Sequence, residues 1–248
     1  MKLKWSAFLA LIIGFAVVVC FAIYSLIRLS HEEPRCPDKR GMVYIPAGSF
    51  WVRYEGERWK AEGRSDELVE LNAFCIDRFE YPNLWLWKPR VKVSWQKAKD
   101  LCAKQGERLC AGYEWQKAFG GPEGLRYPYG NEFDQNRCNT YYQIGNRIFA
   151  RSRARSGIFK RCVSPYGVYD MSGNVSEWTD ELWQNGFDDR VLRGGSFNTN
   201  IHNCQRLQPN GMWHFCNYSE SIGSIHHHPP FLLKDDDGFR CCAEPIKD

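Results

Sequence analysis

The sequence predicts an α+β domain with little regular secondary structure, preceded by one N-terminal transmembrane helix. Three observations lead to this fold class: an uncharged apolar segment at residues 5–27, few long periodic segments after Gly120, and 10 Trp and 11 Cys among 248 residues. A domain with few regular elements must fill its core with large side chains and be held by cross-links or ions. The remaining composition, 44% hydrophobic and 25% charged, is typical of a folded chain, and the length suits one ordinary domain.

The charge balance argues against a nucleic-acid-binding protein. Three of the 33 Lys and Arg residues lie in the first 29 positions, which contain no acid, so residues 30–248 carry 30 basic against 29 acidic side chains. Nucleic-acid binding depends on a strongly basic face. We therefore expect no nucleic-acid partner.

Residues 1–29 are interpreted as a membrane anchor that contacts the lipid bilayer through residues 5–27. As a helix this segment would be roughly 35 Å long, enough to cross a bilayer core of about 30 Å. A cleaved signal peptide is the main alternative, but its apolar region is shorter, about 7 to 15 residues. Cys20 follows three valines rather than a small residue, which disfavours lipoprotein processing at that position.

The cysteines indicate which side of the membrane the domain occupies, because the positive charges on both flanks of the span do not decide the orientation. Ten cysteines lie outside the span, an even number with no CxxC pair. Such a set favours disulfides in an oxidising compartment, with free buried thiols as the alternative. We therefore expect a single-pass membrane protein with a cytoplasmic N-terminus and a periplasmic or extracytoplasmic domain. The ten are Cys36, Cys75, Cys102, Cys110, Cys138, Cys162, Cys204, Cys216, Cys241 and Cys242.

The first half of the domain predicts two strands. Residues 30–41 lack apolar periodicity and contain two prolines, which is typical of a tether, and the domain would occupy residues 42–248. Residues 42–51 alternate and predict a strand interrupted by Pro46 and Gly48. A polar surface excursion at residues 52–70 and a second strand at residues 73–76 would follow.

Two helices are expected next. Ser94 can cap a helix that Gly106 ends, and its apolar residues fall on one face. These residues are Trp95, Ala98, Leu101 and Cys102. A second helix is predicted over residues 113–119, and beyond Gly120 the sequence predicts turns rich in Gly, Asn, Pro and aromatic residues.

A series of short motifs in a fixed order covers nearly all of residues 42–243. They are Met42-Val-Tyr-Ile-Pro-Ala-Gly-Ser-Phe50, Phe74-Cys-Ile-Asp-Arg-Phe-Glu80 with Pro82-Asn83, Val93-Ser-Trp95, Gly106-Glu-Arg-Leu109 with Glu114-Trp115, Tyr127-Pro-Tyr-Gly130, Tyr166-Gly-Val-Tyr-Asp-Met-Ser-Gly-Asn-Val-Ser-Glu-Trp178, Val191-Leu-Arg-Gly-Gly-Ser-Phe197 and Gly238-Phe-Arg-Cys241. This order resembles the formylglycine-generating enzyme (sulfatase-modifying factor) family. The resemblance implies an irregular α+β fold related to C-type lectins, built around a small sheet and two helices.

The resemblance also implies a catalytic site that this chain does not complete. The family's enzymes oxidise a sulfatase cysteine to formylglycine with molecular oxygen and copper(I) held by two thiolates. After the Gly-Gly-Ser segment at residues 194–198 the first thiolate position is Thr199 and the second is Cys204. A cuprous ion needs sulfur donors, and a protonated hydroxyl cannot replace one, so we expect no copper site. If the site is active, Cys204 and Ser196 are its catalytic residues, and Cys216 offers Cys204 a disulfide partner.

The motif at residues 173–178 departs from the family in another way, since Ser176 stands where the family commonly has tryptophan. A structural calcium ion is nevertheless implied around this loop. Two carboxylates with two carbonyls between them suit a hard cation that takes six to eight oxygens, and solvated loop acids are the alternative. The implied ligands are Asp170, Gly173, Val175 and Glu177. A second family site would begin at Asn139 and Thr140, but the following loop offers no aspartate.

One disulfide, Cys102 with Cys241, is carried over from the resemblance. The other eight cysteines outside the span permit 105 pairings, which the sequence does not decide. Cys138 with Cys162 is a further hypothesis, because the two bracket one long loop.

Six cations lie within that loop. The region could lie on anionic lipid headgroups or grip an acidic partner, or be a solvated loop. The cations are Arg147, Arg151, Arg153, Arg155, Lys160 and Arg161.

Three other polar groups are weaker site candidates. Residues 226–228 are adjacent histidines whose side chains would alternate in direction, so they are not expected to converge on one metal. Residues 235–237 are aspartates that suggest a charged turn. His202 and His214 flank Cys204 and Cys216, but no residue that would orient a Cys/His pair can be named.

The preferred hypothesis is therefore a membrane-anchored extracytoplasmic module, non-catalytic, that serves as a binding or assembly subunit of a membrane complex with a protein partner. The alternative is an enzyme, either a copper-dependent formylglycine-generating oxidase acting on sulfatase cysteines or another oxidation chemistry on the same fold.

Overall fold

The computed structural model describes residues 13–14, 17–21, 35–37, 41–52, 66–183, 188–198 and 225–246. The chain divides into two compact units, one comprising Met1–Arg35 with Ile246–Asp248 and the other Cys36–Pro245. In the first unit, residues 17–21 are helical and exposed. The predicted span lies mostly outside the described residues, and none of the helices in the described part is both long and apolar enough to cross a bilayer.

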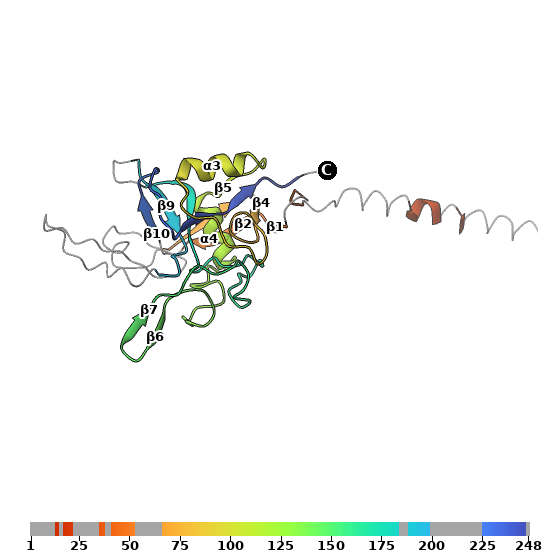
Figure 1. The fold of residues 1–248 in the computed structure, drawn as a ribbon. Helices are drawn as coiled ribbons and strands as arrows, with labels where there is room; N and C mark the ends of the chain where they lie inside the picture. The colour runs from red at the N-terminus through yellow and green to blue at the C-terminus, as the bar shows by residue number, and fades with distance from the viewer. Residues whose placement is uncertain are drawn as a thin grey trace, which may run out of the picture. The chain divides into compact units, whose positions relative to one another are not determined.

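The second unit is built on two four-stranded sheets (Figure 1). One sheet has the order β1-β4-β12-β5, with all neighbours antiparallel. The other has the order β10-β9-β8-β11, in which β11 pairs with β8 in parallel. Two hairpins, β2-β3 and β6-β7, complete the strands, and Figure 1 shows β6-β7 projecting away from the side that carries α3. The strands are β1 (Met42–Ile45), β2 (Gly48–Val52), β3 (Glu67–Leu71), β4 (Phe74–Asp77), β5 (Arg108–Leu109), β6 (Tyr142–Ile144), β7 (Arg147–Phe149), β8 (Ser176–Leu182), β9 (Arg190–Arg193), β10 (Ile225–His228), β11 (Asp237–Phe239) and β12 (Cys241–Ala243).

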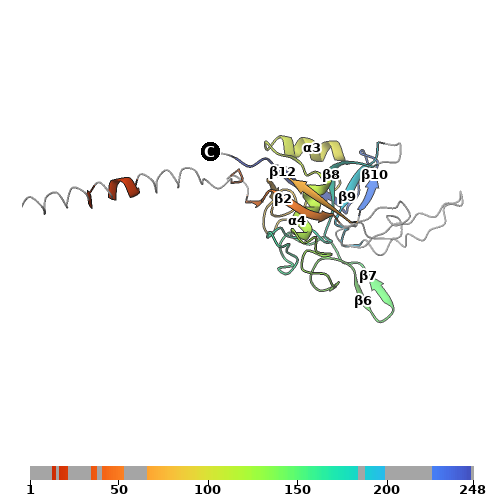
Figure 2. The same ribbon diagram turned by 180° about the vertical axis from the view of Figure 1, so that it is seen from behind.

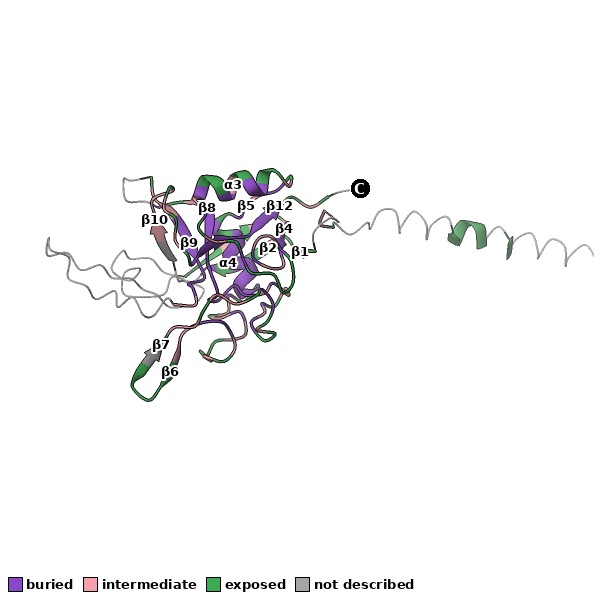
Figure 3. Cartoon of the chain, viewed as in Figure 1, coloured by how far each residue is buried: buried purple, intermediate pink, exposed green. Residues whose placement is uncertain are grey.

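Helix α3 (Trp95–Ala103) forms where the sequence predicts it. The Ser94 side chain accepts a hydrogen bond from the Lys97 N–H at 3.2 Å, which satisfies one donor of the first turn. The four predicted residues are its buried face, and they pack against Leu109, Trp178 and Phe239. The other face of α3 is exposed (Figure 3).

Helix α4 (Gly112–Gly120) is buried along most of its length (Figure 3), which agrees with the second predicted helix to within one residue at each end. Its first turn is closed by Glu114, whose carboxylate accepts the Ala111 N–H at 2.8 Å. Trp115 and Phe119 stack and fill the core beneath the first sheet, against Ile45 and other strand residues.

Strand β12 connects the two cores through adjacent cysteines. Successive side chains of a strand point to opposite faces, so Cys241 reaches Cys102 on α3 whereas Cys242 reaches Cys110. Figure 2 shows β12 passing close to α3. The predicted Cys102–Cys241 disulfide is confirmed, and so is the Cys138–Cys162 hypothesis.

A further disulfide joins Cys36 to Cys75 on β4. Cys20 is the one described cysteine outside a disulfide, whereas Cys204 and Cys216 lie outside the described residues.

Two expectations about secondary structure are wrong. Strand β3 lies mostly inside the segment interpreted as a polar excursion. It was missed because it pairs only with β2 and buries little of its surface, so its sequence shows no buried face. The part of the chain after Gly120 contains a whole four-stranded sheet rather than turns alone. The longest strand there, β8, is fully buried over its first four residues, so it lacks the polar and apolar alternation of a half-buried strand.

Candidate functional site

The segment before the predicted copper site is tightly fixed. Gly194 has φ +87°, and a Cβ added there would lie 2.7 Å from the Met171 carbonyl oxygen and 3.1 Å from the Trp115 ring, so only glycine fits. The Gly194 carbonyl accepts the Gly173 N–H at 2.7 Å. Ser196 is buried, with its Oγ 2.7 Å from Asn198 Oδ1 and 3.0 Å from Asp236 Oδ2.

The residues that would decide copper binding are not among those described. Residues 199–224 fall in a gap, so Thr199, Cys204 and Cys216 have no described geometry, and neither do His202 and His214. The prediction that the copper site is incomplete therefore remains a prediction from the sequence.

The loop of the predicted calcium site leads into a buried acidic cluster. Asp170, Glu177 and Glu80 are each at most 2% exposed, and Arg240 lies among them with no exposed surface. Arg240 binds Glu177 through two hydrogen bonds of 2.6 Å, and the Trp115 indole donates a third at 2.7 Å. These four charged residues are named the buried acidic cluster below.

Polar neighbours hold the other two carboxylates in place. Asp170 Oδ2 accepts the Gly157 N–H at 2.6 Å. Glu80 accepts from the Ser156 hydroxyl at 2.7 Å and from the Asn174 amide at 2.9 Å. The Asn174 amide oxygen in turn accepts from Asn139 at 2.8 Å, which ties the loop of the predicted calcium site to the residue at which the second family site would begin.

The cluster contains three carboxylates and one guanidinium, and this imbalance changes the acidity of its members. Burial raises the pKa of Glu80 well above its usual range, and the charges of Asp170 and Glu177 raise it further. Burial also raises the pKa of Asp170 to about 7, against the opposing effect of the Gly157 N–H and Arg240. A buried excess of negative charge can be relieved by protonation or by a cation.

Among the described residues, the three carboxylates of the buried acidic cluster do not form a group of close ligand atoms. Both Glu177 oxygens accept from Arg240, and Asp170 Oδ2 accepts the Gly157 N–H. Asp170 and Gly173 both have positive φ, +57° and +80°, and a Cβ on Gly173 would lie 2.5 Å from the Asn139 carbonyl oxygen, so this loop is fixed in one conformation. The predicted calcium ligands are the Asp170 and Glu177 carboxylates at the two ends of this loop and the Gly173 and Val175 carbonyls between them in the sequence. A cation held there would share Glu177 with Arg240.

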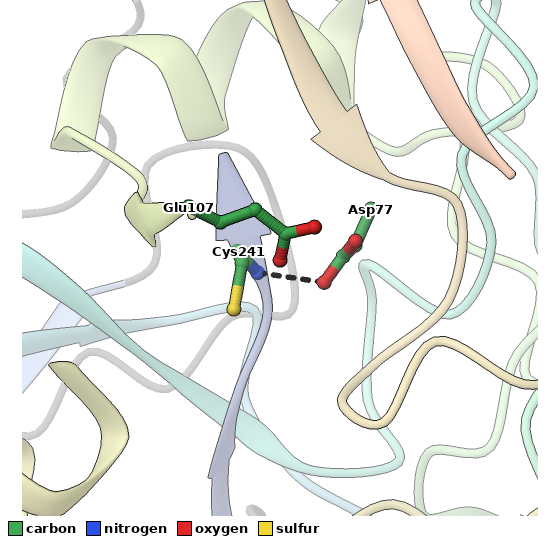
Figure 4. Close-up of side chains that lie close together, drawn as sticks. All are labelled: Asp77, Glu107 and Cys241. Atoms are coloured by element: carbon green, nitrogen blue, oxygen red, sulfur yellow. Dashed lines mark hydrogen bonds between the residues drawn. The ribbon is translucent and has the colours of Figure 1, made fainter. Parts of the chain in front are cut away.

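A second group of possible ligands lies at the junction of β4 and β12 (Figure 4). Ligand atoms of Asp77, Glu107 and Cys241 are within 4.8 Å of one another, which makes this a candidate metal site. Asp77 Oδ2 accepts the Cys241 N–H at 2.9 Å and Oδ1 accepts from Asn83 at 2.8 Å. The Cys241 sulfur is bonded to Cys102, so the anionic ligands here are the two carboxylates. The three residues are far apart in the sequence, and no spacing signal could have predicted this group.

The six cations of the predicted lipid-contacting loop are not all alike in the structure. Arg151 is half-buried, lies 4.9 Å above the Tyr142 ring and donates to the Gln135 carbonyl at 3.2 Å. Arg153 is also half-buried. The four exposed cations are Arg147, Arg155, Lys160 and Arg161.

The histidines of β10 and the nearby aspartates form separate pairs. His227 lies 2.7 Å from Asp189 and stacks on the Trp183 ring, whereas His228 lies 2.9 Å from Asp237. The predicted turn is found at residues 235 and 236, but Asp237 begins β11. Asp236 and Asp237 are buried, at 6% and 0% exposed, rather than solvated.

Taken with the fold, these features define a class of protein: a disulfide-linked α+β domain in which two sheets meet at a buried acidic cluster beside a Gly-Gly-Ser segment. The profile of the sulfatase-modifying factor enzyme 1-like domain matches residues 87–244, and the chain belongs to this family.

Similar proteins include formylglycine-generating enzymes and proteins named as inactive members of that group. The chain is 33% identical over 166 residues to the inactive C-alpha-formylglycine-generating enzyme 2 of Bos taurus, covering 62% of this chain and 50% of that protein. It is 28% identical over 249 residues to the formylglycine-generating enzyme of Thermomonospora curvata, covering 90% and 73%. The chain thus spans about half the length of its inactive relatives.

Solved structures confirm the predicted formylglycine-generating-enzyme-like fold. PvdO from Pseudomonas aeruginosa matches with a TM-score of 0.61 at 18% identity, covering 86% of this chain and 99% of that one. CarF matches with a TM-score of 0.57 at 20% identity, covering 84% and 99%.

Proposed function

We propose that this chain is a non-catalytic sulfatase-modifying-factor-like module, anchored in a membrane with its domain in an oxidising compartment, and that it acts as an accessory subunit of a membrane complex. The observation that carries the proposal is Thr199, an oxygen donor at a position where the family's copper site needs sulfur. The likeness to proteins named inactive supports it.

The extracytoplasmic location is supported by the chemistry of the described cysteines. Eight of them form four disulfides, which persist in oxidising compartments and are rare in a reducing cytosol. The uncharged residues 5–27 are long enough to serve as the anchor.

A bound calcium ion is part of the proposal. The buried acidic cluster has an excess of carboxylates over cations, and a hard cation would neutralise it while fixing the loop that leads into β8. The ligands would be Asp170 and Glu177 with the Gly173 and Val175 carbonyls.

The alternative function, a copper-dependent formylglycine-generating oxidase, is favoured by the match to the Thermomonospora curvata enzyme over 90% of the chain. Incubating the purified full chain with copper(I), oxygen and a cysteine-containing sulfatase peptide separates the two. We expect no stoichiometric copper and no aldehyde, and both together would overturn the non-catalytic proposal.

A matched variant makes this experiment sharper. Thr199→Cys restores the missing thiolate, so this variant should bind copper(I) if the remainder of the site is intact, whereas Thr199→Cys with Cys204→Ser should not. Copper bound equally by the unmodified chain and by Cys204→Ser would show that Cys204 is not a ligand.

A further inference from the structure

An exposed apolar turn lies between β4 and α3. Four consecutive large apolar residues are exposed there, Leu84 at 45%, Trp85 at 60%, Leu86 at 36% and Trp87 at 60%. A run of this kind lowers solubility when it faces water, so it is typical of an interaction site. Residues 84–87 are named the tryptophan turn below.

The tryptophan turn is held on a fixed base. The Leu86 N–H donates to the Ser156 carbonyl at 3.0 Å, and the Ser156 N–H donates to the Trp87 carbonyl at 2.8 Å. Trp85 also lies against Gly157, where an added Cβ would be 2.7 Å from its ring. The turn therefore presents its side chains in a set arrangement, which reduces the entropy lost on binding.

Exposed cations follow the turn in the sequence, and the same segment contains no acid. Lys88, Arg90 and Lys92 follow it and are exposed, and residues 81–92 contain no Asp or Glu. Arg155 belongs to the cation-rich residues 147–161, named the basic loop below. It donates to the Leu86 carbonyl at 3.0 Å, which places this part of the basic loop at the base of the turn. Residues 147–162 also contain no acid.

The basic loop adds an apolar side chain next to the turn. Ile158 is 52% exposed, and its N–H donates to the Arg155 carbonyl at 3.2 Å. Lys160 and Arg161 follow in the same loop and are exposed. Apolar side chains and cations are thus presented together.

We propose that the tryptophan turn inserts into the interface of an anionic phospholipid bilayer, with these cations on the headgroup phosphates. Tryptophan prefers the membrane interface because its ring is apolar and its N–H is polar, and leucine adds apolar area that reaches the acyl chains. Each Lys or Arg near an anionic surface adds an attraction that corresponds to about a five-fold change in the binding equilibrium.

A bilayer is favoured over a protein partner by the combination of features. A protein-binding patch needs only shape and apolar area, whereas an exposed Trp-Leu turn with Lys88 next to it in the sequence and Arg155 bonded to its backbone complements an anionic surface. This contact gives the proposed membrane location a second element and does not require the anchor, because its residues lie outside residues 5–27.

The test uses the full chain reconstituted in vesicles of phosphatidylcholine, with or without phosphatidylglycerol, whose acyl chains are brominated to quench nearby tryptophan. The double variant Trp85→Phe with Trp87→Phe removes the two reporters and keeps the turn apolar. Trp51→Phe, on β2 and 42% exposed, is the matched control.

We expect phosphatidylglycerol vesicles to quench a component of the fluorescence that is absent from the double variant and retained in the Trp51 variant. Replacing Lys88, Arg155 and Lys160 with glutamine should remove the dependence on phosphatidylglycerol. Equal quenching of the unmodified chain and the double variant would overturn the proposal. So would a quenched component, present in the unmodified chain and lost in the double variant, that is the same with and without phosphatidylglycerol.

A separate measurement distinguishes failure of the anchor from failure of this proposal. Flotation in high salt reports the anchor, because salt screens the cations of the turn but does not release a spanning helix. Loss of flotation in high salt with retained low-salt quenching of Trp85 and Trp87 would contradict the anchor alone.

Discussion

At Arg240, a guanidinium with no exposed surface meets three carboxylates in the interior of the protein. It donates to both oxygens of Glu177, to the Asp77 carbonyl at 3.0 Å and to the Tyr169 carbonyl at 2.9 Å. One side chain thus joins β4, β8 and Tyr169, the residue that precedes the loop of the predicted calcium site. Removing one partner of such a buried ion pair destabilises the protein, because the other partner is left as an uncompensated buried charge.

We predict that Arg240→Met destabilises the protein by about 3–5 kcal/mol, because Glu177 would be left as an uncompensated buried charge. Lys99→Ala is the control, since Lys99 and Asp180 form an exposed pair at 3.7 Å and exposed pairs contribute about 0–1 kcal/mol. Urea unfolding measures both. A cost below that of the control would show that the guanidinium does not stabilise this cluster.

A second residue-scale prediction concerns pH. Glu80 and Asp170 have raised pKa values in the folded protein, so each binds its proton more tightly there than in the unfolded chain. Their contribution is fully present below the unfolded pKa of about 4 and is lost as pH rises, for Asp170 through its folded value of about 7.

In calcium-free buffer the free energy of unfolding should therefore fall between pH 4 and 7, as followed by urea unfolding at each pH. Glu80→Gln keeps a neutral side chain of the same shape and should flatten the curve. A variant curve parallel to that of the unmodified chain would contradict this assignment.

At the scale of elements, the features predicted correctly were those with a local physical cause. Helix α3 has a serine cap and four apolar residues on one face, and both are written in consecutive residues. Strands β11 and β12 were missed because each has three residues, all buried, and so carries no alternation. Pairing between β11 and β8 in parallel joins segments about 60 residues apart, which local patterns do not encode.

The disulfides at β12 give a prediction at this scale. Cys102–Cys241 closes a loop with a sequence separation of 139, and Cys138–Cys162 one of 24. Loop-closure entropy makes the first worth about 5 kcal/mol and the second about 3.5 kcal/mol.

Replacing both cysteines of each pair by alanine in separate variants and measuring unfolding in urea should preserve that order. A larger loss of unfolding free energy from removing Cys138–Cys162 would show that restriction of the unfolded chain is not what makes these disulfides stabilising.

For the molecule as a whole, the candidate site was predicted in part. Asp170 and Glu177 were implied by the resemblance, because they belong to one motif that can be read in the sequence. Glu80 and Arg240 were not, since the pairing of charges more than 60 residues apart has no sequence signal. The group around Asp77 was missed for the same reason.

Whether a metal stabilises the whole fold can be decided by chelation, and two variants show where it binds. An ion present at 100 times its dissociation constant stabilises the folded state by about 2.7 kcal/mol, so its removal should lower Tm by roughly 5–10 °C.

Two variants locate the ion. Asp170→Asn keeps an acceptor for the Gly157 N–H but removes a charged ligand from the buried acidic cluster. Glu107→Gln removes a charged ligand from the second candidate metal site. If calcium lies in the buried acidic cluster, Asp170→Asn should lose the response to chelator and Glu107→Gln should keep it. The reverse result would move the ion to the group around Asp77, and an unchanged Tm in the unmodified chain would leave protonation as the means by which the cluster is neutralised.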